Sequence, residues 1–263
     1  MMNAAVLTIF PEMFDPFLTN GMMKRAIDSC KLLVSLVNIR DFASGRHRVT
    51  DDRPYGGGCG MVLKPEPLAG AIRATRETAA YDRTILLSPQ GRSFDQAAAE
   101  ELASLEGFIL VCGRYEGVDE RIVTDFIDDE ISIGDYILTG GELAAMVIID
   151  AVTRLVPGVL GGSESAEKES FNGSLLEHAH YTRPGEFEGQ SVPEVLQSGN
   201  HKAIDAYRLE ASLIRTFLKR RDLLEKRSLG EGELDTLRKW ALDIEKIIHD
   251  QSSRGTDTLS GGQ

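Results

Sequence analysis

The chain has 263 residues, and its 29 Lys and Arg against 41 Asp and Glu leave a formal net charge of −12. Hydrophobic residues make up 42% of the chain, which is enough to build a core and excludes wholesale disorder. No apolar run reaches the roughly 18–20 residues that cross a bilayer, and the acidic total argues against gross attraction to nucleic acid unless a local basic face exists.

Short apolar, β-rich runs alternate with amphipathic segments over the first two-thirds of the chain. The pattern predicts strands over residues 4–9, 32–38, 84–87, 108–112 and 130–133. It predicts helices over residues 15–30, 65–78 and 95–105, and a further helix from Glu142 to the Pro157-Gly158 pair. Because strands and helices alternate, we expect an α/β fold with a mostly parallel sheet covered by helices.

The composition changes at Gly161. Residues 161–170 are polar and predict a flexible linker between an α/β domain over residues 1–160 and a helical domain over residues 171–250. In the second domain an apolar stripe recurs at helical spacing: Ile204, Tyr207, Ala211, Ile214 and Leu218. The Ser/Gly/Thr-rich segment over residues 251–263 is predicted to be a disordered tail.

The cysteines and the N-terminal segment favour a cytoplasmic location. Cys30, Cys59 and Cys112 are far apart and odd in number, which is typical of a reducing compartment and not of a disulfide framework. A secretory signal begins with a basic region, but no basic residue precedes Lys24. The five histidines show no paired spacing, so we expect no protein-built metal site.

Three loops at predicted strand ends are the strongest functional feature of the sequence. They cover residues 88–91 (SPQG), 113–117 (GRYEG) and 133–141 (IGDYILTGG). In open α/β sheets ligands bind at the carboxyl ends of strands, and glycine lets the backbone approach a ligand closely. One such loop would be an ordinary turn, but three in succession favour a ligand site.

The charges of these loops bear on the kind of ligand. Neither a GxxxxGK[ST] nor a GxGxxG phosphate-binding motif follows a predicted strand. The loops and the residues after them carry Glu116, Asp119, Glu120 and Asp135. These carboxylates would repel a pyrophosphate but tolerate a cation, so they favour a sulfonium such as S-adenosylmethionine over NAD or ATP. Pairing with nearby arginines, or exposure to solvent, would account for them equally well.

A local basic stretch interrupts the acidic chain. Residues 201–227 hold eight Lys and Arg against four Asp and Glu. Arg208, Arg215 and Lys219 fall on one helical face, opposite the apolar stripe, which suits phosphate contacts. Residues 178–184 add imidazole, aromatic and guanidinium groups, which suit base stacking and backbone contacts. An ordinary solvated face and a packed loop remain the alternative interpretations.

Several motifs occur in an order that resembles one family. They cover residues 9–14 (IFPEMF), 53–58 (RPYGGG), 88–91, 113–121, 133–141, 157–161 (PGVLG) and 180–184 (HYTRP). Each is weak alone. Together, from the first strand to about Trp240, they identify the chain as similar to the bacterial tRNA (guanine-N1)-methyltransferases, the TrmD family.

The resemblance implies a SPOUT-type fold: a mostly parallel sheet whose C-terminal part forms a deep trefoil knot, followed by a small all-helical domain that helps to grip tRNA. It also implies a homodimer with active sites at the subunit interface and no membrane or DNA partner. The implied reaction is methyl transfer from S-adenosylmethionine, bound bent in the knot, to N1 of the guanine immediately 3′ of the anticodon, position 37.

The resemblance assigns residues to the cofactor and to tRNA. The implied cofactor-binding residues are Leu87, Ser88, Pro89, Gly113, Tyr115, Glu116, Ile133, Gly134, Tyr136, Ile137, Leu138, Gly140 and Gly141. The implied tRNA-binding residues are His180, Arg183, Arg208, Arg215 and Lys219. Dependence on a divalent ion such as Mg²⁺ is implied as well, without a dedicated protein site.

The resemblance also supplies a catalytic pair. Guanine N1 carries a proton at neutral pH, so a general base must remove it, and a cation would stabilise the charge that develops on the ring. The family assigns these roles to positions that match Glu169 and Arg154. By themselves, Glu169 would be a solvated charge, and Arg154 would pair with Asp150 or face the helix C-terminus.

The chain departs from the family pattern at a few positions. Glu169 stands where the family has Asp, so the reach of the carboxylate differs, and Glu167 competes for the same role. Cys59 replaces a proline, and the His178-Ala179 pair replaces Cys-Pro.

Two rival functions differ in what they require. A nucleotide-dependent oxidoreductase needs a phosphate-binding glycine motif, which the sequence lacks. A non-catalytic RNA-binding relative would have lost its catalytic groups, whereas Arg154 and a linker carboxylate are both present. Binding of S-adenosylmethionine but not NAD would exclude the first rival, and methyl transfer would exclude the second.

Overall fold

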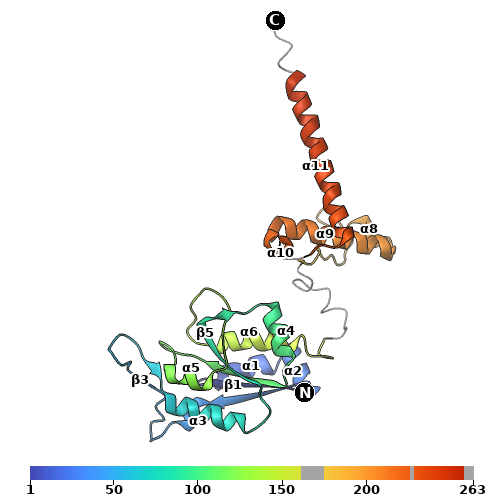
Figure 1. Cartoon of the computed structure of the whole chain (residues 1–263). Helices are drawn as coiled ribbons and strands as arrows, with labels where there is room; N and C mark the ends of the chain where they lie inside the picture. Colours follow the sequence, from blue (N-terminus) through green and yellow to red (C-terminus); the bar gives the residue numbers. More distant parts are fainter. Residues whose placement is uncertain (161–174, 226–227, 258–263) are drawn as a thin grey trace. The chain divides into compact units, whose positions relative to one another are not determined.

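The computed structural model describes residues 1–160, 175–225 and 228–257 of the chain. The chain divides into two compact units, Met1–Ala166 and Glu167–Gln263 (Figure 1). None of the helices in the described ranges combines the length and apolar character needed to span a membrane.

The first unit is built on a five-stranded parallel sheet. Its strands are β1 (Met2–Thr8), β2 (Leu32–Asn38), β5 (Arg83–Ser93), β6 (Gly107–Cys112) and β7 (Asp129–Ser132). They lie in the order β2-β1-β6-β5-β7, and every neighbouring pair is parallel. A small antiparallel pair, β3 (Asp51–Asp52) and β4 (Val62–Leu63), lies outside this sheet. The predicted α/β fold with a mostly parallel sheet is confirmed.

Helices cover both faces of the sheet (Figure 1). One face packs against α2 (Gly21–Asp28), α4 (Gln96–Ala103) and α6 (Glu142–Thr153), and the other against α3 (Pro65–Arg76) and α5 (Glu120–Phe126). Along β1, Ala4 and Val6 join the first core while Ala5 and Leu7 join the second. Because successive side chains point to opposite faces, a strand covered on both sides must be apolar throughout, as β1 is.

The predicted elements of this unit differ from the structure in three places. The helix predicted over residues 15–30 is interrupted, because Asn20 is extended and separates α1 (Asp15–Leu18) from α2. The strand predicted to end at Leu87 continues to Ser93 after a shift in register. Helix α5 was not predicted, although the Asp119 side chain caps it by accepting from the Arg121 N–H at 3.0 Å.

The second unit contains four helices in its described part: α8 (Glu194–Gln197), α9 (His201–Lys219), α10 (Arg221–Glu225) and α11 (Glu231–Asp257). The expectation of an all-helical domain is wrong in one respect, because β8 (Glu186–Phe187) and β9 (Gln190–Ser191) form an antiparallel hairpin. Both turn residues have positive φ, 50° at Glu188 and 79° at Gly189. This is the backbone of a type I′ turn, whose twist matches that of paired strands.

The helix at the C-terminal end also runs further than predicted. Residues 251–257 belong to α11, whereas the sequence predicts a disordered tail from Gln251. A formed helix can continue past its last apolar residue, because each added residue contributes a further hydrogen bond without a new nucleation step. Residues 258–263 and the predicted linker, 161–170, lie outside the described residues.

Candidate active site in the first unit

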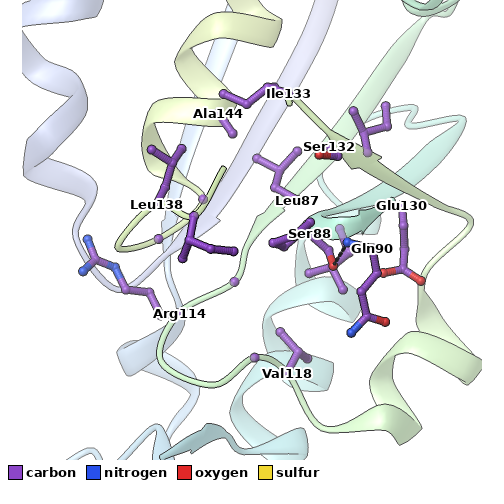
Figure 2. Close-up of a pocket in the computed structure, with 18 of the residues that line it drawn as sticks. Leu87, Ser88, Gln90, Arg114, Val118, Glu130, Ser132, Ile133, Leu138 and Ala144 are labelled. Atoms are coloured by element: carbon purple, nitrogen blue, oxygen red, sulfur yellow. Dashed lines mark hydrogen bonds between the residues drawn. The ribbon is translucent and has the colours of Figure 1, made fainter. Parts of the chain in front are cut away.

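The three predicted loops meet around one cavity of about 410 Å³, beyond Leu87 of β5 and at the carboxyl ends of β6 and β7 (Figure 2). All thirteen residues that the resemblance assigned to the cofactor line this cavity. Parallel strands end at the same edge of a sheet, so the segments that follow neighbouring strands come together there. The structure thus brings together residues that lie up to about fifty positions apart in the chain.

The first loop lies against β7 as an irregularity within β5. Pairing with β7 shifts register between Leu87 and Arg92, and the Gln90 N–H donates to Ser88 Oγ at 3.1 Å (Figure 2). A Cβ on Gly91 would lie 2.4 Å from the backbone of Glu130 and Ile131. Only glycine fits there, because any side chain would separate the bulge from β7.

The second and third loops are joined through their backbones. The Gly141 N–H donates to the Gly113 carbonyl at 2.9 Å, and Arg114 and Gly140 form an isolated antiparallel bridge. A Cβ on Gly141 would lie 2.8 Å from Cys112 Cα, so this approach also requires glycine. In the same wall Tyr115 has a φ of 61°, a left-handed conformation that is costly for a residue with a side chain.

A buried polar network lies beside the junction of these loops. Glu142, the first residue of α6, is 1% exposed and accepts a hydrogen bond from Thr8 Oγ1 at 2.7 Å. Its carboxylate also pairs with the Arg114 guanidinium at 3.2 Å, which lies 4.4 Å over the Phe10 ring. The network therefore ties the second loop to the start of α6 and to the end of β1, and it neutralises the positive charge of Arg114.

The cavity wall carries more negative than positive charge. Glu116, Glu120 and Glu130 line it, whereas Arg114, its cationic lining residue, is already paired with Glu142. Of the other predicted carboxylates, Asp135 and Asp119 are not lining residues. Hydrogen bonds from Arg121, at 2.7 and 2.8 Å, hold the pKa of Asp119 below its ordinary value.

The lining combines apolar and polar side chains. Figure 2 shows Leu138 and Arg114 at one end of the cavity, Leu87 near its middle, and Gln90 and Glu130 at the other end. An apolar cleft with a few placed polar groups is the usual form of a small-molecule site.

Of the two predicted catalytic residues, the structure describes Arg154, which does not line the cavity. Arg154 is the C-cap of α6, where its N–H donates to the Asp150 carbonyl at 3.3 Å and its side chain is half-buried. Glu169 and its competitor Glu167 lie outside the described residues.

The predicted tRNA residues of the second unit separate into two groups. Arg215 and Lys219 line a groove of about 370 Å³ on α9 with Ile214 and Leu218. Arg208 lies outside that groove, 3.9 Å from Asp205. His180 and Arg183 are exposed in the segment before the hairpin.

The expectation that these cations lie opposite the apolar stripe is wrong for Arg215 and Lys219. Helix α9 buries Ile204 of that stripe together with Ser212, Leu213 and Thr216, which lie outside it, and leaves Leu218 74% exposed beside the cations. Spacing alone does not say which of two partly apolar faces a helix buries, because the packing partner decides it.

Sequence reasoning missed several groups at or near these sites. Thr8 and Glu142 carry the buried network, and Glu130 lines the cavity. The GGE sequence at residues 140–142 could have drawn attention to Glu142, because a carboxylate is favoured in the first turn of a helix. In the second unit, ligand atoms of Glu177, His178 and His180 lie within 4.8 Å of one another, although no metal site was expected.

Comparison with known proteins gives a consistent answer. The family model for tRNA (Guanine-1)-methyltransferase TrmD matches residues 2–226. A protein of Desulfatibacillum aliphaticivorans named tRNA (guanine-N(1)-)-methyltransferase is 55% identical over 259 residues, 98% of this chain and 99% of its own length. Proteins of the same name from Carboxydothermus hydrogenoformans and Anoxybacillus flavithermus are each 51% identical, over 96% and 91% of this chain and 99% and 98% of their own lengths. With the parallel sheet and the three-loop cavity, these matches show that the chain belongs to the tRNA (guanine-1)-methyltransferase family, TrmD.

Proposed function

We propose that this chain transfers the methyl group of S-adenosylmethionine to N1 of the guanine immediately 3′ of the anticodon, position 37, in tRNA. Family membership over residues 2–226 is the observation that carries the proposal. The names of the similar proteins, tRNA (guanine-N(1)-)-methyltransferase, agree with the reaction type and the substrate class.

The cavity fits the proposed methyl donor in size and charge. Its volume of about 410 Å³ is within the usual range for a small-molecule site. The close backbone approach at Gly141 leaves main-chain groups, and no side chain, at that point of the wall. Three lining carboxylates suit a positively charged sulfonium and would repel a dinucleotide pyrophosphate.

The reaction places two demands on the chain. S-adenosylmethionine, when bound, supplies an electrophilic methyl group. The target N1 must lose a proton before it can attack, and we assign that proton to the Glu169 carboxylate, with Glu167 as the alternative. Arg154 then stabilises the negative charge that spreads over the guanine ring and O6.

The position of Arg154 favours the proposed homodimer. In its own chain this residue ends α6 and does not line the cavity. A dimer whose active sites lie at the subunit interface would bring such a residue to a reacting base held by two chains.

We further propose that the C-terminal part of the sheet forms a trefoil knot. Family membership over residues 2–226 supports this.

The second unit is proposed to hold the tRNA in the cytoplasm, with no DNA or membrane partner. The exposed His180 and Arg183 precede the hairpin, while Arg215 and Lys219 share a groove with exposed aliphatic side chains. Cations beside apolar surface suit the phosphates and the unstacked bases of a tRNA loop. Arg208, beside Asp205, completes the proposed set.

Methyl-labelled S-adenosylmethionine and two tRNA transcripts test the function directly. One transcript has guanine 3′ of the anticodon and the other has adenine there. We expect label only in the first, mapped to N1 of that guanine, and we expect NAD not to compete for binding. No label in either transcript, with S-adenosylmethionine still bound, would refute methyl transfer to this position.

Substitution of Glu169 tests the assignment of the general base. Glu169→Gln is expected to lower methyl transfer by about 10²–10⁴-fold, the usual contribution of a general base, while the affinity for S-adenosylmethionine stays within about twofold. Glu167→Gln is the matched control and is expected to retain activity. The reverse pattern, with Glu167→Gln inactive, would move the base to Glu167.

A further inference from the structure

A small cluster of side chains that can ligate a metal lies in the second unit. Ligand atoms of Glu177, His178 and His180 lie within 4.8 Å of one another. We propose that these three residues form a binding site for a transition-metal ion of the zinc class. The proposal does not rest on the proposed methyl transfer, although His180 also belongs to the proposed tRNA-binding residues.

The donor set selects the class of ion. Two imidazoles and one carboxylate suit Zn²⁺, Co²⁺ or Ni²⁺, whereas Mg²⁺ and Ca²⁺ prefer sites made of oxygen atoms alone. A tetrahedral ion with bonds of about 2.0–2.2 Å requires ligand atoms roughly 3.4 Å apart. Glu177 Oε1 and His180 Nε2 lie 2.9 Å apart as a pair joined by the proton on Nε2. A metal ion would displace that proton and take its place between the two atoms.

The tautomer of His178 favours metal binding. Its Nδ1 lies 3.2 Å from the Ala179 carbonyl oxygen, which can only accept, so Nδ1 carries the hydrogen of that bond. In the neutral ring, Nε2 then has a free lone pair. In metal sites, a ligating histidine usually donates a hydrogen bond from its other ring nitrogen, often to a backbone carbonyl.

The backbone around the cluster is attached to α9. The Leu176 N–H donates to Oγ1 of the fully buried Thr216 at 2.9 Å. Further along, Ala179 lines the groove on α9 together with Tyr207 and Ala211. The backbone that carries the ligands is therefore fixed before an ion binds, which lowers the conformational entropy lost on binding.

The site is open on one side. The His180 side chain is 64% exposed and that of Glu177 is 33% exposed, so water or a phosphate oxygen can fill the remaining coordination positions. A bound ion would also add positive charge directly before Tyr181 and Arg183, in a chain whose formal net charge is −12.

Isothermal titration of the full, untagged chain with ZnCl₂ tests the proposal. Cys30 and Cys59 are exposed thiols that bind zinc themselves, so the parent protein carries Cys30→Ser and Cys59→Ser. We expect one Zn²⁺ per chain, and at least about a tenfold weaker affinity in His178→Ala, since loss of even an outer-shell partner costs that much. His201→Ala removes another exposed histidine and is expected to leave the affinity unchanged.

A second variant and a spectroscopic readout make the test independent of any single substitution. Glu177→Gln is expected to weaken Zn²⁺ binding as well, and Co²⁺ bound to the parent is expected to give visible d–d bands that both variants reduce. Circular dichroism verifies that the variants are folded. Absence of saturable Zn²⁺ binding to the parent would overturn the proposal, as would His178→Ala and Glu177→Gln variants that bind like the parent.

Discussion

Replacing Glu142 by alanine tests whether the buried network beside the cavity stabilises the first unit. The substitution removes the acceptor of the Thr8 hydroxyl, which is 0% exposed, and leaves the Arg114 guanidinium without its carboxylate. Loss of one partner from a buried ion pair costs about 3–5 kcal/mol. The Arg114 side chain is 18% exposed and lies over the Phe10 ring, so it retains some solvation. We therefore expect a loss near the lower limit, about 3 kcal/mol.

Urea unfolding followed by two probes measures this loss. Far-UV circular dichroism reports on both units, whereas Trp240, the single tryptophan, lies in α11 of the second unit. With a slope of about 2 kcal/mol per M, the dichroism transition of the first unit should move by about 1.5 M. The Trp240 fluorescence transition should stay in place, because separate units unfold separately.

Two further variants show whether the effect arises from the ion pair. Leu143→Ala changes the neighbouring residue of α6, whose side chain is 50% exposed, and is expected to cost less than about 0.5 kcal/mol. The double variant Glu142→Gln/Arg114→Met is expected to be more stable than the sum of its single variants predicts, because neither charge is left unpaired. Strict additivity, or a loss below about 1 kcal/mol in Glu142→Ala, would refute this account of the network.

Two other predictions concern the loop junction and the edge of the sheet. Gly141→Ala should cost about 1–3 kcal/mol and weaken S-adenosylmethionine binding, because the new Cβ would lie 2.8 Å from Cys112 Cα. Gly232→Ala, where the new Cβ on α11 meets open space, should change neither stability nor S-adenosylmethionine binding. If calorimetry gave equal effects for Gly141→Ala and Gly232→Ala, crowding at Cys112 would not be the cause. A hydrogen bond from Arg83 lowers the pKa of Glu101 below its ordinary 4.5, so the ionised carboxylate stabilises the fold above that pH and loses this contribution as the pH falls further. Glu101→Gln should flatten the acid limb of a stability–pH curve, and an unchanged limb would contradict the assignment.

Much of the local structure follows from the sequence. The predicted strand over residues 32–38 coincides with β2, and the predicted strands over residues 108–112 and 130–133 lie within one residue of β6 and β7. Apolar β-rich runs bounded by glycine and proline define such elements, because turn geometry and side-chain alternation are local properties. The loops that follow these strands were predicted for the same reason.

The tertiary structure alone decides which of these residues meet. Strand order places the three loops around one cavity, and only the packing of α6 against the sheet removes Glu142 from water and joins it to Thr8. Likewise the partner of α9 determines that its Leu213 face is buried and its Leu218 face is exposed. Contacts between distant segments depend on the shape of the whole unit, which neither periodicity nor spacing along the chain contains. The sequence therefore predicts the loops and their chemistry, and the fold decides how they are assembled.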